Sequence, residues 1–249
     1  MTDPGRAPAW GGIRHPLLVG VPHAFCVPGG PAGPAAARVV RPRQVHGTDV
    51  TSVRNGAPLR EAADAIVARR APRAASPVGI LTADCVPVLA ASESGAAVAA
   101  IHAGWRGLAA GVLEAGIAAL REAAGAGEEL IAVVGPHVGA CCYEVDRPVI
   151  EPLVDRFGRP AVEAATAASG PGRPGHWQLD LGMLAREDLQ RAGVAPARCS
   201  RVHVECTCCD PRGFASYRRD GAAATRMLHC IAPGASTCGG SGAAARRDP

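Results

Sequence analysis

The stretch "GILTADCVPVLAASESGAAVAAIHAGWRG", residues 79–107, holds the pattern that decides the fold. Two apolar runs, residues 86–91 and 96–101, flank the turn-forming sequence Ser-Glu-Ser-Gly. Apolar runs joined by a short polar turn predict a β-hairpin with buried strands. In a hairpin the start of the first strand lies opposite the end of the second, so we expect Cys85 and His102 to be neighbours.

The rest of the chain mixes strands and helices. Beyond residue 107, apolar residues recur at helical spacing up to the glycines at 125–127, which predicts an amphipathic helix. Further helices are expected after the capping residues Asp146 and Asp180, over residues 147–157 and 181–192. Strands are expected at residues 39–40, 50–53, 63–69, 130–134 and 201–206.

These elements follow no strict βαβ alternation, which predicts one α/β (α+β) domain of mixed β-sheets flanked by helices. We expect residues 1–36, rich in Pro and Gly, to be irregular. Residues 37–232 are expected to form the single catalytic domain, and residues 233–249 to be a disordered tail.

Composition excludes several classes of protein. Hydrophobic residues make up 48% and charged residues 19% of the chain, as in globular proteins. The net charge is +4 and no basic stripe is present, so nucleic acid is not an expected partner. No apolar segment long enough for a membrane span or a signal peptide is visible, which predicts a cytoplasmic protein whose ten Cys are thiols.

Cys85 and His102 are the leading site candidates. A lone Cys or strand-end His is usually structural, but His102 opens "HAGWRG" at a strand-to-helix junction, where ligands tend to bind. A Cys–His pair serves either as nucleophile and base or as two ligands of a transition metal, most often zinc. His46 in "QVHGTDV" would complete a His₂Cys set with one open position, as in catalytic zinc sites.

Two charged residues adjoin these candidates. Asp84, next to Cys85, is a candidate for proton transfer or for orienting a metal ligand. Arg106 lies in the "HAGWRG" segment and could hold phosphate, although in this chain all 26 basic residues are Arg and an ordinary surface role is as common.

A second thiol-rich segment is "VHVECTCCDP", residues 202–211, with His203, Cys206, Cys208 and Cys209. On an extended strand Cys206 and Cys208 would share a face. We recognise no standard zinc motif in the spacing of these four residues, and therefore expect ordinary thiols in a core-facing loop. The pair Cys141 and Cys142 receives the same interpretation.

Several motifs occur together and in order: "QVHGTDV", "DAIVAR", "LTADCVPVLAA", "AAIHAGWRG", "GPHVGACCYEV" and "FASYRRDG". From about Gln44 to about Arg226 the chain resembles the YfiH-like laccase-domain family. The resemblance implies a fold like that of a deamidating bacterial toxin, and zinc bound by His46, Cys85 and His102. It also implies phosphorolysis of adenosine, inosine, guanosine and methylthioadenosine, with adenosine deamination as a further activity. Purine nucleosides and phosphate are then the expected partners, and the protein a monomer or small homo-oligomer.

Three alternatives remain open. A cysteine hydrolase or amidase, of the kind linked to peptidoglycan precursor editing, would use Cys85 and His102 without metal. A copper polyphenol oxidase is less favoured, because blue-copper sites often use an axial Met and no Met adjoins the three ligands in sequence. A zinc-bearing protein without activity is the third, since only residues 31–43 separate Gly30 from Gln44 where family members carry a longer stretch.

Overall fold

The computed structural model describes residues 10–27, 38–54, 56–70, 76–167, 173–203, 206–210 and 213–234. The strands are β1 (His23–Val27), β2 (Val50–Arg54), β3 (Ala57–Pro58), β4 (Ala65–Arg69), β5 (Val78–Thr82), β6 (Val86–Ser92), β7 (Ala97–Ala103), β8 (Leu130–Val134), β9 (Glu144–Asp146), β10 (His176–Gln178), β11 (Cys199–Arg201) and β12 (Met227–Ile231). The α-helices are α1 (Trp105–Ala110), α2 (Val112–Ala124), α3 (Arg147–Phe157), α4 (Arg159–Ala167), α5 (Leu181–Arg191) and α6 (Tyr217–Asp220).

A seven-stranded mixed sheet forms the centre, in the order β11-β8-β6-β7-β4-β2-β3. The predicted hairpin is confirmed: β6 and β7 pair antiparallel, with Pro87 opposite His102. Every residue of both strands is buried. Strands without an exposed face need cover on both sides of the sheet, which explains why their sequences are continuous apolar runs.

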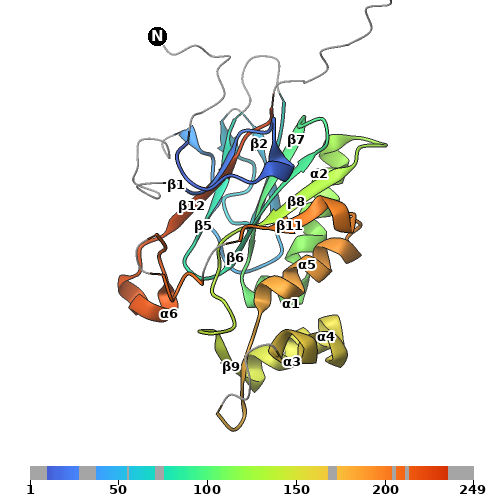
Figure 1. Cartoon of the computed structure of the whole chain (residues 1–249). Helices are drawn as coiled ribbons and strands as arrows, with labels where there is room; N and C mark the ends of the chain where they lie inside the picture. Colours follow the sequence, from blue (N-terminus) through green and yellow to red (C-terminus); the bar gives the residue numbers. More distant parts are fainter. Residues whose placement is uncertain are drawn as a thin grey trace, which may run out of the picture.

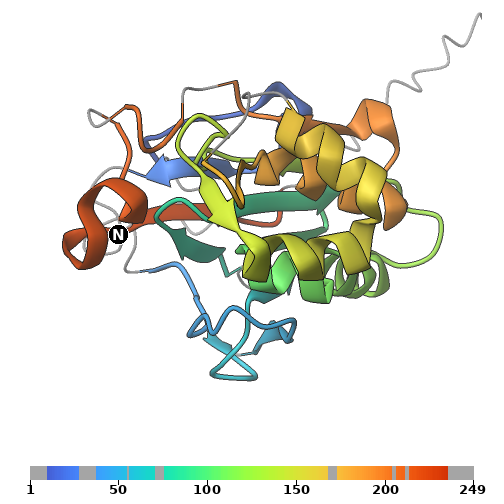
Figure 2. The same ribbon diagram turned by 90° about the horizontal axis from the view of Figure 1, so that it is seen from below.

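Helices cover one face of this sheet. Val88 and Ala90 of β6 pack in one core with Leu113, Ile117 and other apolar residues of α2 and α5. Figures 1 and 2 show α3, α4 and α5 gathered on one side of the molecule and α6 on the other. The predicted single helix after residue 107 is two helices, because Gly111 between them has a φ of 95°, which ends α1.

A second, three-stranded sheet in the order β1-β12-β5 covers the opposite face. Leu89 of β6 packs there with Phe25 of β1 and Ile80 of β5. The domain therefore has three layers, and the predicted fold class is confirmed. Because β1 and a 3-10 turn, Pro16–Leu18, lie within residues 10–27, the expectation that residues 1–36 are irregular is wrong for that part.

The remaining predicted elements are largely in place. Strand β8 and helix α3 have the predicted bounds, and Asp180 caps α5 by accepting a hydrogen bond from the Met183 amide. Asp146 takes the N-cap position of α3 without a side-chain bond. Of the strand predicted over residues 201–206, only Arg201 is in a strand, as the last residue of β11. Residues 202, 203 and 206 are not in a strand, and residues 204 and 205 lie outside the described residues. The tail after residue 234 lies outside the described residues.

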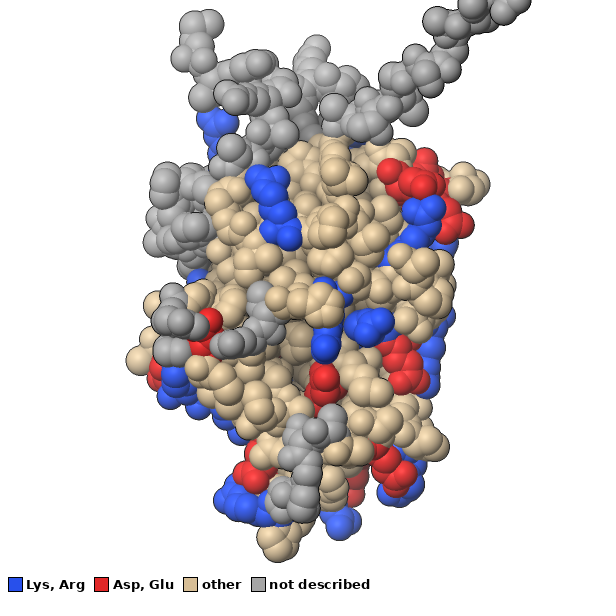
Figure 3. All heavy atoms as spheres, in the orientation of Figure 1, with Lys and Arg blue, Asp and Glu red and all other residues tan. Residues whose placement is uncertain are grey.

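One face of the molecule shows no concentration of one charge. In Figure 3, basic and acidic side chains lie interspersed on the visible face. Within the described ranges, no helix combines the length and the apolar character needed to traverse a lipid bilayer.

Candidate metal centre

The three predicted ligands meet at one point. Ligand atoms of His46, Cys85 and His102 all lie within 4.8 Å of one another. Cys85 Sγ is 4.0 Å from His46 Nε2, and the two imidazole rings stand nearly perpendicular with centroids 4.8 Å apart. His46 is exposed, Cys85 half-buried and His102 buried, so the group runs from solvent into the core.

One carboxylate, Asp64 at the foot of β4, organises two of these ligands. Its Oδ1 accepts from His102 Nδ1 at 2.8 Å, and its two oxygens also accept from the amides of Val45, His46 and Gly47 at 3.1, 2.9 and 2.7 Å. Asp64 is fully buried. Because Nδ1 is engaged, Nε2 of His102 is left to act as a ligand, an arrangement common among metal-binding histidines.

The turn that carries His46 is fixed on its other side by Gln44. The Gln44 side chain donates to the carbonyl of Leu81 at 2.7 Å and accepts from its amide at 2.8 Å, as a neighbouring strand would. His46 itself has a φ of 60°, a conformation that L residues adopt only with such support.

Close packing around the trio requires a glycine at position 104. A Cβ there would lie 2.9 Å from His46 Cδ2 and 3.2 Å from Cys85 Sγ. The "HAGWRG" segment therefore keeps Gly104 so that backbone can approach the ligands closely.

The electrostatics of the site favour a thiolate. Burial opposes ionisation of Cys85, but hydrogen bonds and charge from His102 and His46 outweigh it and lower its pKa to about 6. Burial also opposes a charged His102, yet Asp64 and Cys85 raise its pKa to about 9. Metal ligation and nucleophilic attack both need the thiolate form of Cys.

The donor set fits a tetrahedral zinc ion. Zn–S and Zn–N bonds of about 2.3 and 2.0–2.1 Å place sulfur and nitrogen about 3.6 Å apart. The observed separation of 4.0 Å between Cys85 Sγ and His46 Nε2 is a few tenths of an ångström wider. Two imidazoles and one thiolate leave a fourth position free for water or substrate.

The trio opens into a cavity of about 650 Å³. Its walls contain the aromatic rings of Trp105, Tyr143 and Tyr217 and four guanidinium groups, those of Arg43, Arg106, Arg218 and Arg226. Arg106 lies 4.3 Å over the Trp105 ring and Arg218 lies 5.1 Å over the Tyr143 ring. Potential metal ligands, flat apolar surfaces and cations thus share one cavity.

Asp84 lies on the cavity wall with its carboxylate already engaged. It accepts from Thr207 Oγ1 at 2.7 Å, Ser216 Oγ at 3.0 Å and the Arg218 amide at 2.6 Å. Its φ is 82°, which turns the chain just before Cys85. The residue therefore connects the Cys85 segment to the segment from Thr207 to Arg218.

Sequence reasoning missed two members of this arrangement. Asp64 was visible as an acid within the apolar segment "ADAIVAR", and a buried acid at the start of a strand is a signal of a specific partner. Tyr143 lies within "GPHVGACCYEV" and had no local signal beyond its aromatic ring.

Comparisons with known proteins identify the family of the chain. The model of a family described as "Multi-copper polyphenol oxidoreductase laccase" matches residues 31–233. The chain belongs to this laccase-domain family, the YfiH family. A purine nucleoside phosphorylase of Xylella fastidiosa strain Temecula1 is 40% identical over 183 residues, covering 72% of this chain and 66% of the relative. The chain thus spans just under two thirds of that protein.

Other members are similar over more of their length. The Escherichia coli K12 protein named purine nucleoside phosphorylase YfiH is 34% identical over 189 residues, which are 76% of this chain and 72% of the relative. The crystal structure of YlmD from Geobacillus stearothermophilus matches with a TM-score of 0.72 at 25% identity, over 92% of this chain and 98% of that one. The Bacillus licheniformis YfiH structure has a TM-score of 0.68 at 27% identity, with 78% and 74% covered.

Proposed function

We propose that the chain is a zinc-dependent purine nucleoside phosphorylase whose ligands are His46, Cys85 and His102. The observation that carries the proposal is the opening of this trio into a cavity that also holds aromatic rings and four guanidinium groups. Purine nucleosides and phosphate are the partners that such walls suit, and the relatives' names support the same reaction. Adenosine, inosine, guanosine and methylthioadenosine are the proposed substrates, with adenosine deamination as a further activity.

In phosphorolysis, a phosphate oxygen bonds to the anomeric carbon of ribose as the bond from that carbon to the purine nitrogen breaks. The transition state gathers positive charge on the sugar and negative charge on the departing base. Zinc, when bound, supplies a Lewis acid beside the reacting groups.

In this proposal the chain's own residues bind the two substrates and position the ligands. Arg106, with the other guanidinium groups of the cavity, binds the phosphate anion through charge-assisted hydrogen bonds. Trp105 and Tyr143 present flat apolar surface to the purine. Asp84 acts as a positioning residue for Cys85, because its carboxylate oxygens are held by three donors and not directed at a substrate.

The metal we propose is zinc and not copper. Blue-copper sites combine His₂Cys with a long axial bond, often from Met. Of the described methionines, Met183 and Met227, neither lines the cavity, and Met227 contacts Cys26 instead.

A cysteine hydrolase is the second candidate, and one observation favours it. Cys85, His102 and Asp64 stand in the order of a nucleophile, a base and the carboxylate that orients the base. His46 argues against a metal-free triad, since such a triad needs no second imidazole on the sulfur. A hydrolase of this kind would be inhibited by zinc and alkylated at Cys85 by iodoacetamide with loss of activity.

Product analysis tests the proposal. Zinc-loaded protein is incubated with each nucleoside, with and without phosphate, beside Cys85→Ala and the matched thiol control Cys208→Ala. We expect free base and ribose phosphate only when phosphate is present, no turnover by Cys85→Ala and full turnover by Cys208→Ala. Ammonia from adenosine, with or without phosphate, identifies deamination. Unchanged nucleosides under all conditions would overturn the proposal.

A further inference from the structure

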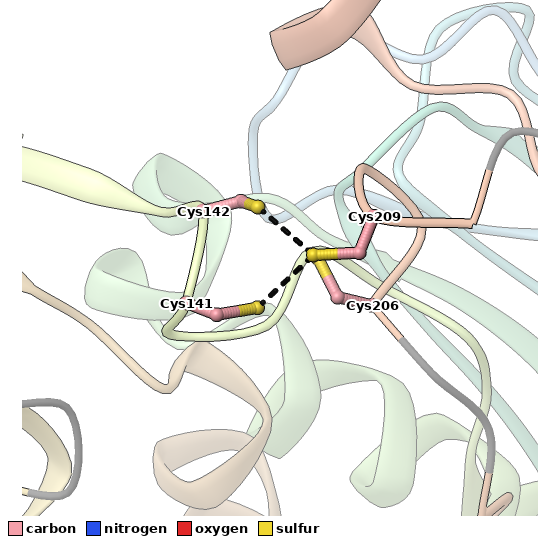
Figure 4. Close-up of side chains that lie close together, drawn as sticks. All are labelled: Cys141, Cys142, Cys206 and Cys209. Atoms are coloured by element: carbon pink, nitrogen blue, oxygen red, sulfur yellow. Dashed lines mark hydrogen bonds between the residues drawn. The ribbon is translucent and has the colours of Figure 1, made fainter.

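A second group of potential metal ligands lies outside the cavity. Cys141 and Cys142 occupy the turn after β8, and Cys206 and Cys209 lie in a turn more than 60 residues later (Figure 4). Their four sulfurs all lie within 4.8 Å of one another. Cys141 and Cys209 are exposed and the other two half-buried, so the expectation that these thiols face the core is wrong.

The turn at residues 207–209 decides which of these cysteines converge. In an extended strand Cys206 and Cys208 would have shared a face. Because the chain turns there, Cys206 and Cys209 converge, and Cys208 stays outside the group. The relevant pattern is therefore Cys-x-x-Cys over residues 206–209, a spacing that zinc sites commonly use.

The sulfur separations suit one shared ion. Cys209 Sγ lies 3.2 Å from Cys142 Sγ and 3.5 Å from Cys141 Sγ. A disulfide needs about 2.05 Å. Four sulfurs each about 2.3 Å from a tetrahedral zinc ion are about 3.8 Å apart. A four-iron cluster would spread the sulfurs more widely, since each binds a different iron.

Backbone donors surround one of these sulfurs. The amide of Gly139 donates to Cys206 Sγ at 3.1 Å, and the amides of Cys208 and Cys209 also hydrogen-bond to it. Amides directed at a sulfur stabilise its charged form, as in the outer coordination sphere of metal thiolates. A Cβ at Gly139 would lie 3.2 Å from Cys206 Cβ and 3.4 Å from Cys141 Sγ, so a glycine suits this close approach.

We propose that Cys141, Cys142, Cys206 and Cys209 bind one tetrahedral zinc ion as four thiolates, in a site separate from the His46, Cys85 and His102 trio. The thiols release their protons to solvent when the ion binds. Four protein ligands leave no open position, which is the pattern of a structural site. The ion joins the loop after β8 to the loop before α6. It thereby links Tyr143, which lines the cavity, to Thr207, which donates a hydrogen bond to Asp84 on the cavity wall.

Metal content and coordination test this site without reference to turnover. We expect wild-type protein purified anaerobically to hold two zinc ions per chain, and Cys85→Ala to keep one. X-ray absorption of zinc in Cys85→Ala should show four sulfurs at about 2.3 Å and no nitrogen. Cys209→Ser should lose this second ion, while the matched control Cys208→Ser keeps both.

Each other outcome decides against the site. Cys85→Ala without zinc, or with nitrogen around its zinc, would overturn the proposal. So would an intact wild-type mass lighter by two hydrogens with a Cys142–Cys209 disulfide. If Cys209→Ser does not fold, the absorption spectrum of Cys85→Ala still gives the answer. Failure of nucleoside turnover leaves this result unaffected.

Discussion

Replacement of Asp64 by Asn is the most informative perturbation of the metal centre. The carboxylate accepts four hydrogen bonds, from three amides and from His102 Nδ1. An Asn side chain has one oxygen and cannot serve all four. If its oxygen faces the Val45 and Gly47 amides, its NH₂ faces His102 Nδ1 and the His46 amide.

The expected magnitude follows from this count. Hydrogen bonds to a charged group are each worth about 1.5–3 kcal/mol, so loss of two, partly offset by relaxation, should cost about 2–4 kcal/mol of folding free energy. An NH₂ at this place also makes Nδ1 an acceptor, which moves the proton of neutral His102 to Nε2. That proton occupies the position through which the ring would bind metal. Loss of such an orienting partner typically lowers metal affinity by about 10–100-fold.

The assay is zinc competition against a chromophoric chelator, together with thermal unfolding. The matched control is Asp188→Asn, because Asp188 is buried on α5 and pairs with Arg156 at 2.8 Å outside the cavity. We expect Asp188→Asn to lose stability but keep its zinc affinity at the trio. Wild-type zinc affinity in Asp64→Asn would refute the view that this carboxylate sets the ligand form of His102.

Three further perturbations probe separate parts of the structure. Gly104→Ala places a methyl group 2.9 Å from His46 Cδ2 and should weaken zinc binding about tenfold, or about 1.4 kcal/mol. The control Gly213→Ala has open space around its added methyl group and should bind zinc as the wild type does. Equal zinc affinities of the two variants in chelator competition would contradict this prediction. Burial lowers the pKa of His229 to about 3, so a proton binds this residue more tightly in the unfolded chain than in the folded one. The free energy of unfolding should therefore fall by up to about 1.4 kcal/mol per pH unit as the pH drops from 6.5 toward 3. Urea titrations at several pH values should show a shallower fall for His229→Gln, and parallel profiles would argue against its neutral burial. Arg106→Gln should raise the KM for phosphate about tenfold with the nucleoside KM unchanged, as expected for one lost charge-assisted contact, while the exposed control Arg147→Gln changes neither.

The central hairpin was predictable because its signal is local. Residues 86–103 carry two apolar runs and a turn, and their pairing brings Cys85 beside His102 without any knowledge of the remaining fold. By contrast, β5 pairs with β12, which lies about 150 residues away, and no local sequence pattern identifies β12 as its partner. Short apolar runs predict that a strand exists, but not the strand it joins.

The same distinction separates the ligands from the groups that hold them. His46 is marked by its motif, but the role of Asp64 depends on three segments that meet only in the folded chain, namely the turn at residues 45–47, the foot of β4 and the end of β7. The Cys206 and Cys209 pair was missed for a different reason. The sequence predicted a loop there, but no local pattern shows that the turn at residues 207–209 directs Cys206 and Cys209 toward the same point.

The segment between β11 and β12 shows why a metal crosslink suits this fold. Within residues 206–210 and 213–226, the only buried side chains are those of Thr207 and Ser216, both polar. A segment that buries so little apolar surface gains little from the hydrophobic effect and must be held by specific contacts. Asp84 supplies some of them, since it accepts from Thr207, Ser216 and the Arg218 amide. The proposed tetrathiolate ion would anchor the start of the segment to the turn at residues 139–142. Because Arg218 and Tyr143 contact each other across the cavity wall, the ion that stabilises these loops would also fix the shape of the cavity.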